Sequence, residues 1–294
     1  MKFRSSLLAA VPALVFSCAA ITTAQESSPA APEAGPVSEA QSQFQKAIAG
    51  LDWKNDGQGD IGGMATISVP SGFTFTGREG TIKMMELYGN LTSGQEGGYL
   101  APQNHSWFAV FEFDEVGYVK DDEKDKLDAN EILKQMQEGQ KEANKELSRR
   151  GMETLEVVGW KTPPFYNPAT NNLEWAIILR TASGGQTLNY KTKLLGRKGV
   201  MDVVLVCDEK ELDTVLPQFQ DLIKGFAFNP GNTYAEYKKG DKIAQYGLTG
   251  LIIGGGLLAA AKSGLLSKLI KPIIGGLLII GVFIKRLFGG KSAA

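Results

Sequence analysis

The fold is decided by the stretch LEWAIILRTASGGQTLNYKTKLLGRKGVMDVVLVC, which runs from Leu173 to Cys207. It contains three runs rich in apolar residues, which predict strands at Leu173–Thr181, Gln186–Leu195 and Val200–Cys207. Short polar links with glycine separate these runs, and links of that length join antiparallel neighbours because a parallel connection needs a longer crossover. The stretch therefore predicts the centre of an antiparallel sheet.

The residues on either side add further strands to this pattern. The segment MATISVPSGFTF (64–75) predicts two short strands around a Pro-Ser-Gly turn. A strand is also predicted within residues 106–119, where Trp107, Ala109, Phe111 and Phe113 share one face. Two more predicted strands are Thr154–Trp160 and Gly225–Phe228.

Helical patterns lie between these blocks of strands. Gly77–Tyr88 predicts a short helix, and a long one follows Asp128, which can cap it, with Gly151 as its end. A third helix starts near Asp208, and Pro217 is expected to kink or restart it. The grouping predicts an α+β fold in which a single antiparallel β-sheet carries packed helices over residues 44–240.

Bulk composition excludes several classes of function. The formal net charge is −1, and no basic stripe of the kind that nucleic-acid-binding proteins carry is present. One histidine and two cysteines leave too few ligands for a zinc or haem site. No cofactor, no metal and no nucleic-acid partner are therefore expected.

The first 43 residues are predicted to lie outside the folded domain. Residues 1–24 have a basic start, an apolar run and small residues before Gln25, a pattern typical of a secretory signal peptide. An uncleaved anchor and lipidation at Cys18 are the alternatives. Residues 25–43 are rich in Ser, Pro, Ala, Gln and Glu, which predicts a disordered linker. Cys207 is then the remaining cysteine and is interpreted as a small buried apolar residue.

Residues 244–286 predict a membrane segment. Two apolar spans, about 244–261 and 270–286, flank a basic turn and suggest a C-terminal transmembrane helical hairpin. Gly247, Gly250 and Gly254 fall on one side of the first span, so they are expected to form a helix-packing face that permits self-association.

The orientation of the second span stays open. With an exported N-terminus, the turn with Lys262, Lys268 and Lys271 lies in the cytoplasm, as the positive-inside rule requires. The second span would then place Lys285 and Arg286 outside, against that rule. A re-entrant segment and one lying along the inner surface are the alternatives.

Chemically active side chains are sparse. His105 suggests a general base only if an orienting partner joins it, and the ordinary interpretation is a loop histidine. The acids within Lys120–Asp128 resemble a calcium loop, but lysine and isoleucine stand where that loop needs glycine and glutamate, which favours a helix-capping loop. A hydrolase using Asp114 or Asp121 would need two carboxylates in one pocket. No enzyme activity is expected.

One aromatic cluster merits a binding hypothesis. Five aromatic residues occur within a short stretch of the predicted strands and loops: Trp160, Phe165, Tyr166, Trp175 and Tyr190. On one exposed face they would line a groove for a peptide, glycan or lipid tail. On a covered face they would be core, which is the favoured interpretation.

Several blocks of the sequence resemble a known bacterial family. They are GREGTIKMMELYGN (77–90), SWFAVFEFDEVGYVKDDEKDKLDA (106–129), VVGWKTPPFYNPATNNLEWAI (157–177), LNYKTKLLGRKG (188–199) and GNTYAEYKKGDKIAQYGLTGL (231–251). The chain is similar to an uncharacterised family of membrane-anchored proteins with a signal peptide, a domain of unknown function and C-terminal membrane helices. The resemblance implies an envelope location and brings no activity and no catalytic residues.

Together these patterns predict the location of the protein, and they leave several functions open. We expect a protein anchored in the bacterial inner membrane, with its globular domain in the periplasm. Its partners would be the lipid bilayer and a membrane or periplasmic protein, so the expected role is an envelope interaction or structural module. The alternatives are a module that binds a small amphiphile or glycan through the aromatic groove, and a carboxylate-dependent hydrolase.

Overall fold

The computed structural model describes residues 39–90, 92–149 and 151–254. The predicted signal peptide (1–24), most of the predicted linker and the second predicted membrane span (270–286) lie outside the described residues. Of the first predicted span, residues 244–254 are described.

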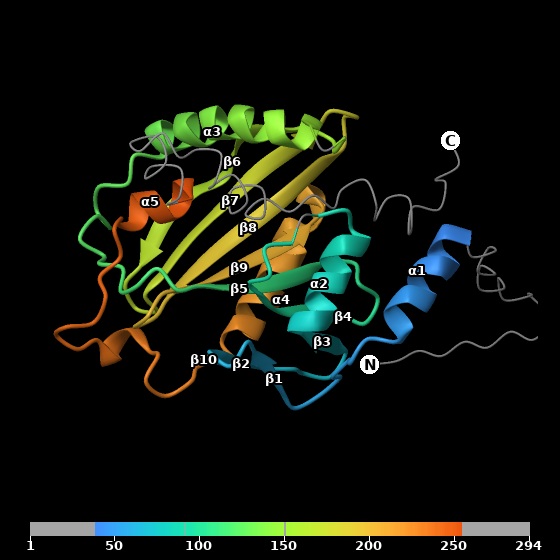
Figure 1. The fold of residues 1–294 in the computed structure, drawn as a ribbon, viewed down its shortest axis with the longest axis horizontal. Helices are drawn as coiled ribbons and strands as arrows, with labels where there is room; N and C mark the ends of the chain where they lie inside the picture. Colours follow the sequence, from blue (N-terminus) through green and yellow to red (C-terminus); the bar gives the residue numbers. More distant parts are fainter. Residues whose placement is uncertain (1–38, 91, 150, 255–294) are drawn as a thin grey trace, which may run out of the picture. The chain divides into compact units, whose positions relative to one another are not determined.

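A seven-stranded antiparallel sheet forms the centre of the domain (Figure 1). Its strands, in spatial order, are β3 (Phe73–Gly77), β4 (Glu96–Pro102), β5 (Phe108–Asp114), β9 (Val200–Cys207), β8 (Gln186–Leu195), β7 (Asn172–Thr181) and β6 (Leu155–Asn167). The strands predicted within 173–207 are confirmed as β7, β8 and β9. They pair in the predicted antiparallel way, with Leu179 opposite Thr187 and Leu195 opposite Val200.

A second, three-stranded sheet corrects the prediction of a single sheet. It consists of β1 (Gln58–Ile61), β2 (Ala65–Ser68) and β10 (Phe226–Phe228), in the order β1-β2-β10. The two strands predicted within 64–75 do form, as β2 and β3, but they enter different sheets. The chain turns between them at Pro70 to Gly72, where Gly72 has a φ of 85° that glycine adopts without strain.

One face of the large sheet is covered by this small sheet and by α4 (Leu212–Ile223). Both contribute apolar side chains to one cluster, including Ile67 from β2 and Phe219 from α4, which pack with Phe111 and Tyr190 of the large sheet. Trp107, Ala109 and Phe111 belong to this cluster and Phe113 packs against it, which confirms their predicted common face. Pro217 lies inside α4, which continues past it to Ile223.

The opposite face is covered by helices at its two ends (Figure 1). At one end, α1 (Glu39–Ala49) and α2 (Arg78–Leu87) contribute to a cluster with β4, β5 and β9. At the other end, α3 (Ala129–Arg149) and α5 (Leu248–Ile253) pack on β7 and its neighbours. Two short 3-10 helices complete the described elements: η1 (Glu209–Glu211) and η2 (Tyr234–Glu236).

Helix ends follow the capping chemistry that the sequence predicts. The Asp128 carboxylate accepts the backbone N–H groups of Asn130 and Glu131, both at 3.0 Å, at the start of α3. The helix ends before Gly151, whose φ is 69°. Asp208 accepts from the backbone N–H of Lys210 at 2.9 Å and caps η1, which leads into α4.

The ordered domain is longer at both ends than predicted. Order was expected from Phe44, whereas α1 begins at Glu39. The domain was expected to end at residue 240, whereas α5 extends it to Ile253, with Leu248 and Leu251 buried. Within the described residues, no helix combines the length and the apolar character that crossing a bilayer requires.

Candidate functional site

The aromatic groove, which the sequence offered as the alternative to core packing, is not assembled. Trp175 is 1% exposed and packs on the face that carries α3, whereas Tyr190 is 2% exposed and packs on the face that carries α4. The register explains the split, because Trp175 lies opposite Lys191 and Tyr190 lies opposite Ala176. Neighbouring residues of a strand point to opposite faces, so these two aromatic rings cannot share a surface.

The other three members of the predicted groove have separate environments. The Trp160 indole donates its Nε1–H to the carbonyl oxygen of Ala129 at 2.9 Å and is half-buried. The Tyr166 hydroxyl donates to Asn171 Oδ1 at 3.2 Å. Phe165 is the member left exposed, at 42%. Trp175 is a core residue, in line with the favoured interpretation, and the half-buried Trp160 and Tyr166 pack against the same apolar cluster.

Charged side chains form a row across the large sheet. Lys193 on β8 lies opposite Asp202 on β9, Asp202 lies opposite Glu112 on β5, and Glu112 lies opposite Glu96 on β4. We call these four residues the charged row. It crosses the face that carries the helices, between the apolar cluster under α1 and α2 and the one under α3 and α5.

Lys193 and Asp202 are the tightly paired members of the charged row. Their Nζ and Oδ2 atoms are 2.7 Å apart, and the side chains are 8% and 6% exposed. Lys191 Nζ donates to the same oxygen at 3.3 Å and is also buried. The Glu96 carboxylate instead accepts the backbone N–H groups of Ser93 and Gly94, at 2.6 and 2.8 Å.

Burial and the charges of neighbouring side chains shift the pKa values of Glu112, Asp202 and Lys191. Burial, reinforced by the charge of Asp202, raises the pKa of Glu112 to about 8. Burial alone would raise the pKa of Asp202, but Lys191 and Lys193 outweigh it and hold that pKa below its usual value. Burial lowers the pKa of Lys191. Glu112 is therefore largely protonated at neutral pH, while Asp202 carries the charge that pairs with Lys193.

The charged row contains neither Asp114 nor Asp121, the two carboxylates that the hydrolase hypothesis offered as candidates. Asp114 lies beside the row, 3.9 Å from Lys193 Nζ, whereas Asp121 lies in a different loop beside Lys124 at 3.7 Å. In the part of the chain that the structure describes, no three His, Cys, Asp or Glu side chains are placed to hold a metal ion.

His105 and Cys207 are both buried. His105 Nδ1 lies 3.1 Å from the Tyr99 hydroxyl, which lies 3.1 Å from the Tyr88 hydroxyl, so the three form a hydrogen-bonded chain. Burial lowers the pKa of His105, which keeps its ring neutral at pH 7. Burial raises the pKa of the Cys207 thiol to about 12, as expected for a small core residue and not for a nucleophile.

The charged row is one candidate site, and the end of the domain that contains α5 is a second. We call it the C-terminal junction, made of residues 115–123 and 234–253. The Tyr118 N–H donates to the Lys242 carbonyl oxygen at 2.8 Å, and the Ala244 N–H donates to the Tyr118 carbonyl oxygen at 2.9 Å. The Glu123 carboxylate accepts the Thr249 N–H at 2.9 Å, so it caps α5.

Acids of the Lys120–Asp128 loop have partners of this kind. Glu123 caps α5, Asp128 caps α3, and Asp121 pairs with Lys124. The contacts of Glu123 and Asp128 therefore agree with the favoured helix-capping interpretation.

Tyrosines stack at the C-terminal junction. The Tyr118 ring lies between two others, with its centroid 4.5 Å from that of Tyr234 and 4.3 Å from that of Tyr237. The Tyr234 hydroxyl donates to the Val119 carbonyl oxygen at 3.0 Å. Tyr237 is 39% exposed, so the stack runs from the packed domain to the surface.

The glycines predicted as a membrane packing face lie at the described end of the chain. Gly247 precedes α5, and a Cβ there would be 2.5 Å from Glu123 Oε1. Gly250 lies within α5, where a Cβ would be 2.6 Å from that of Tyr246. Gly254 follows α5 with a φ of 87°. Gly247 and Gly250 thus have close neighbours inside the domain.

Comparison with known proteins establishes the family. The family DUF2167, described as a protein of unknown function, matches residues 54–285. The chain belongs to this family. No curated protein matches it. Among solved structures, it is similar to the solution structure of cyanobacterial PsbP (CyanoP) from Synechocystis sp. PCC 6803, with 11% identity and a TM-score of 0.35 over 58% of this chain and 90% of that one. At that score the likeness supports no inference about function.

Proposed function

We propose that this member of the DUF2167 family is an exported protein anchored in the bacterial inner membrane by its C-terminal segment. Its α+β domain faces the periplasm and serves as an interaction module for a protein of the envelope. The sequence supports export through residues 1–24 and anchoring through the apolar residues that follow Gly254.

The observation that carries the proposal is the docking of α5. Leu248, Leu251, Ile252 and Ile253 are each at most 7% exposed and pack with α3 and the large sheet. The domain thus extends to Ile253, directly before the residues that we propose as the anchor.

Phe165 supports a protein partner over a small ligand. Its exposed ring projects from β6, which is an edge strand of the large sheet. Pro163 and Pro164 stand beside it in the same strand and lack backbone N–H groups, so this edge is a poor template for adding another strand. A partner would therefore contact the side chains of this edge. The dispersed aromatic residues leave the amphiphile or glycan groove without support.

A topology experiment tests the proposal. Protease added to intact spheroplasts should digest the domain, because it faces the periplasm. The mature chain should begin near Gln25 by intact mass. A domain protected in spheroplasts and digested after lysis, or a mature chain that retains Met1, would overturn the export half of the proposal.

A further inference from the structure

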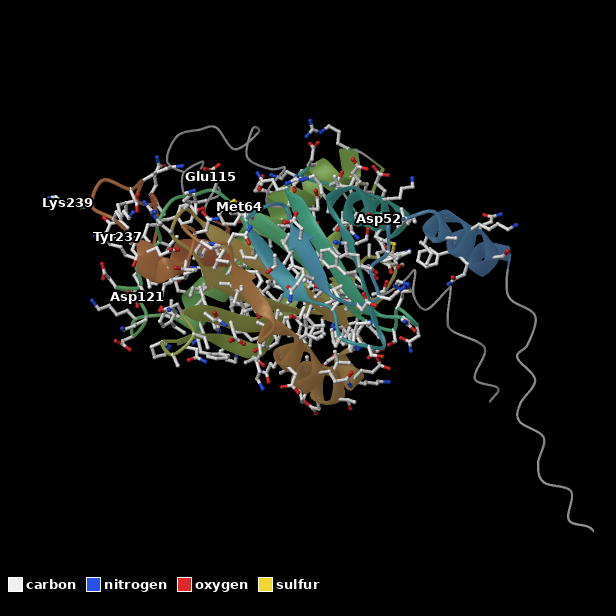
Figure 2. All side chains as sticks on the ribbon, turned by 90° about the horizontal axis from the view of Figure 1, so that it is seen from below. Asp52, Met64, Glu115, Asp121, Tyr237 and Lys239 are labelled. Atoms are coloured by element: carbon white, nitrogen blue, oxygen red, sulfur yellow. The ribbon has the colours of Figure 1, made fainter. Side chains whose placement is uncertain are left out.

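We infer that the segment Tyr237–Ile243 is a preformed contact surface for anionic lipid headgroups. The inference rests on the proposed membrane anchoring and adds which face of the domain meets the bilayer. Figure 2 shows Tyr237 and Lys239 at one end of the domain, with Glu115 and Asp121, while Asp52 is at the other end.

Exposed apolar side chains are concentrated in this segment. Among the described residues, the large hydrophobic side chains that are exposed are Phe165, Tyr237 and Ile243, at 42%, 39% and 38%. Two of these three are the first and last residues of the segment. Tyrosine is enriched where a protein meets the membrane–water interface, because its ring is apolar and its hydroxyl is polar.

The charge of the segment is positive and available to a partner. Lys238, Lys239 and Lys242 are exposed. The acid between them, Asp241, is neutralised by Arg197, whose Nε and Nη2 donate to its two oxygens at 2.7 and 2.8 Å. Lys242 Nζ donates to the Glu115 carbonyl oxygen at 3.2 Å. A cluster of lysines beside an exposed tyrosine favours phosphate headgroups at an anionic surface.

Acidic side chains are also present at this end. Glu115 and Asp122 are exposed, and Asp121 is half-buried and paired with Lys124. They belong to residues 115–122 and not to Tyr237–Ile243. We therefore expect the lysine segment itself, and not the whole end of the domain, to contact the lipid.

Several contacts tie the segment to the rest of the domain. Tyr237 stacks on Tyr118, and Ile243 forms a β-bridge with the same residue. The Arg197–Asp241 pair fixes its middle. Little conformational entropy is then lost on binding. In the sequence, residues 244–256, which include α5, separate the segment from the apolar residues that begin at Leu257, so an anchor there would hold the lysines near the bilayer surface.

Spin labelling of the full chain in vesicles tests the inference. A nitroxide is placed at Ala235→Cys, which is exposed beside the segment and leaves every lysine intact, and in a separate protein at Asp52→Cys, both with Cys18→Ser. The probes are vesicles of phosphatidylcholine alone and of phosphatidylcholine with phosphatidylglycerol. Collision with a water-soluble nickel chelate is measured. The label at position 235 should become severalfold less accessible with phosphatidylglycerol, and the label at 52 should not change.

Matched charge variants test whether the lysines of the segment cause the lipid effect. The triple variant Lys238→Gln, Lys239→Gln, Lys242→Gln should abolish the lipid effect at position 235. The control Lys134→Gln, Lys141→Gln, Lys145→Gln, three exposed lysines of α3, should retain it. Equal accessibility of the label at position 235 in both lipids, or a lipid effect that survives the first triple variant, would overturn the inference. If the chain still floats with the vesicles in that case, the proposed membrane anchoring stands. A chain that does not float with vesicles would overturn the anchoring itself.

Discussion

Lys193 Nζ and Asp202 Oδ2 are 2.7 Å apart on neighbouring strands, with both side chains less than a tenth exposed. Lys191 Nζ shares the same oxygen at 3.3 Å. One carboxylate thus holds two buried ammonium groups at the middle of the sheet. Removing that carboxylate leaves two buried ammonium groups without their negative partner and with little solvent around them. This destabilises the folded protein.

We therefore predict that Asp202→Asn lowers the free energy of unfolding by about 3–5 kcal/mol. Urea unfolding of the chain that ends at Gly254 measures this. The matched control is Lys145→Met, which breaks an exposed pair with Glu142 and should cost at most about 1 kcal/mol. Equal losses in both variants would mean that the Lys193–Asp202 pair is solvated.

Glu112 is expected to contribute to the pH dependence of the free energy of unfolding. Its pKa is raised from 4.5 to about 8, so the folded protein keeps a proton that the unfolded chain has already released. Folding then takes up a proton between these two pH values. Glu112 therefore makes the free energy of unfolding fall as the pH rises from about 4.5 to about 8.

Glu112→Gln should remove this slope. Compared with the unsubstituted chain, stability measured by urea unfolding at several pH values should fall less between pH 5 and 8, by at most about 1.4 kcal/mol per pH unit. Glu138→Gln, at an exposed position of α3, should leave the slope unchanged. A steeper or unchanged slope in Glu112→Gln would show that Glu112 is ionised in the folded protein.

Docking of α5 predicts that Leu248 is a core residue of the domain. Leu248→Ala removes a fully buried side chain and should reduce stability by about 2–5 kcal/mol, or release α5 locally if the rest of the domain is more stable. Hydrogen exchange of the α5 amides, measured together with urea unfolding, distinguishes a loss of global stability from local release of α5. Gln245→Ala, an exposed neighbour, is the control. Unchanged stability together with unchanged exchange at α5 in Leu248→Ala would contradict docking.

The proposed partner contact at Phe165 predicts site-specific crosslinking. A photoreactive amino acid in place of Phe165 should give a discrete adduct in native membranes, because the ring is exposed on an edge strand. The same substitution at Lys141, exposed on α3, should give none of that adduct. Identical adducts from both positions would indicate collision and not a contact.

The sequence predicted best those elements whose own residues determine them. The apolar runs of β7, β8 and β9 have turns between them that fix antiparallel pairing, and Asp128 and Gly151 mark the ends of α3. Elements that depend on tertiary contacts were missed. β4 is EGGYLAP, in which two glycines obscure the apolar alternation, and α1 buries little more than Phe44 and Ile48.

The candidate sites were harder to predict because they depend on register between strands. Trp175 and Tyr190 lie on opposite faces only because the hairpin pairs Trp175 with Lys191. The charged row likewise depends on three registers at once, which align Glu96, Glu112, Asp202 and Lys193. Alternation within one strand cannot supply these alignments. The C-terminal junction was missed because the apolar character of α5 resembles the start of a membrane span.

A C-terminal anchor is tested by comparing the full chain with one that ends at Gly254, both expressed with residues 1–24 and separated into membrane and soluble periplasmic fractions. We predict that the full chain stays with the membranes after a carbonate wash. The shorter chain should be soluble, begin near Gln25 and unfold cooperatively in urea, because α5 completes its core. A shorter chain that stays with the washed membranes, or a full chain that is released, would contradict a C-terminal anchor.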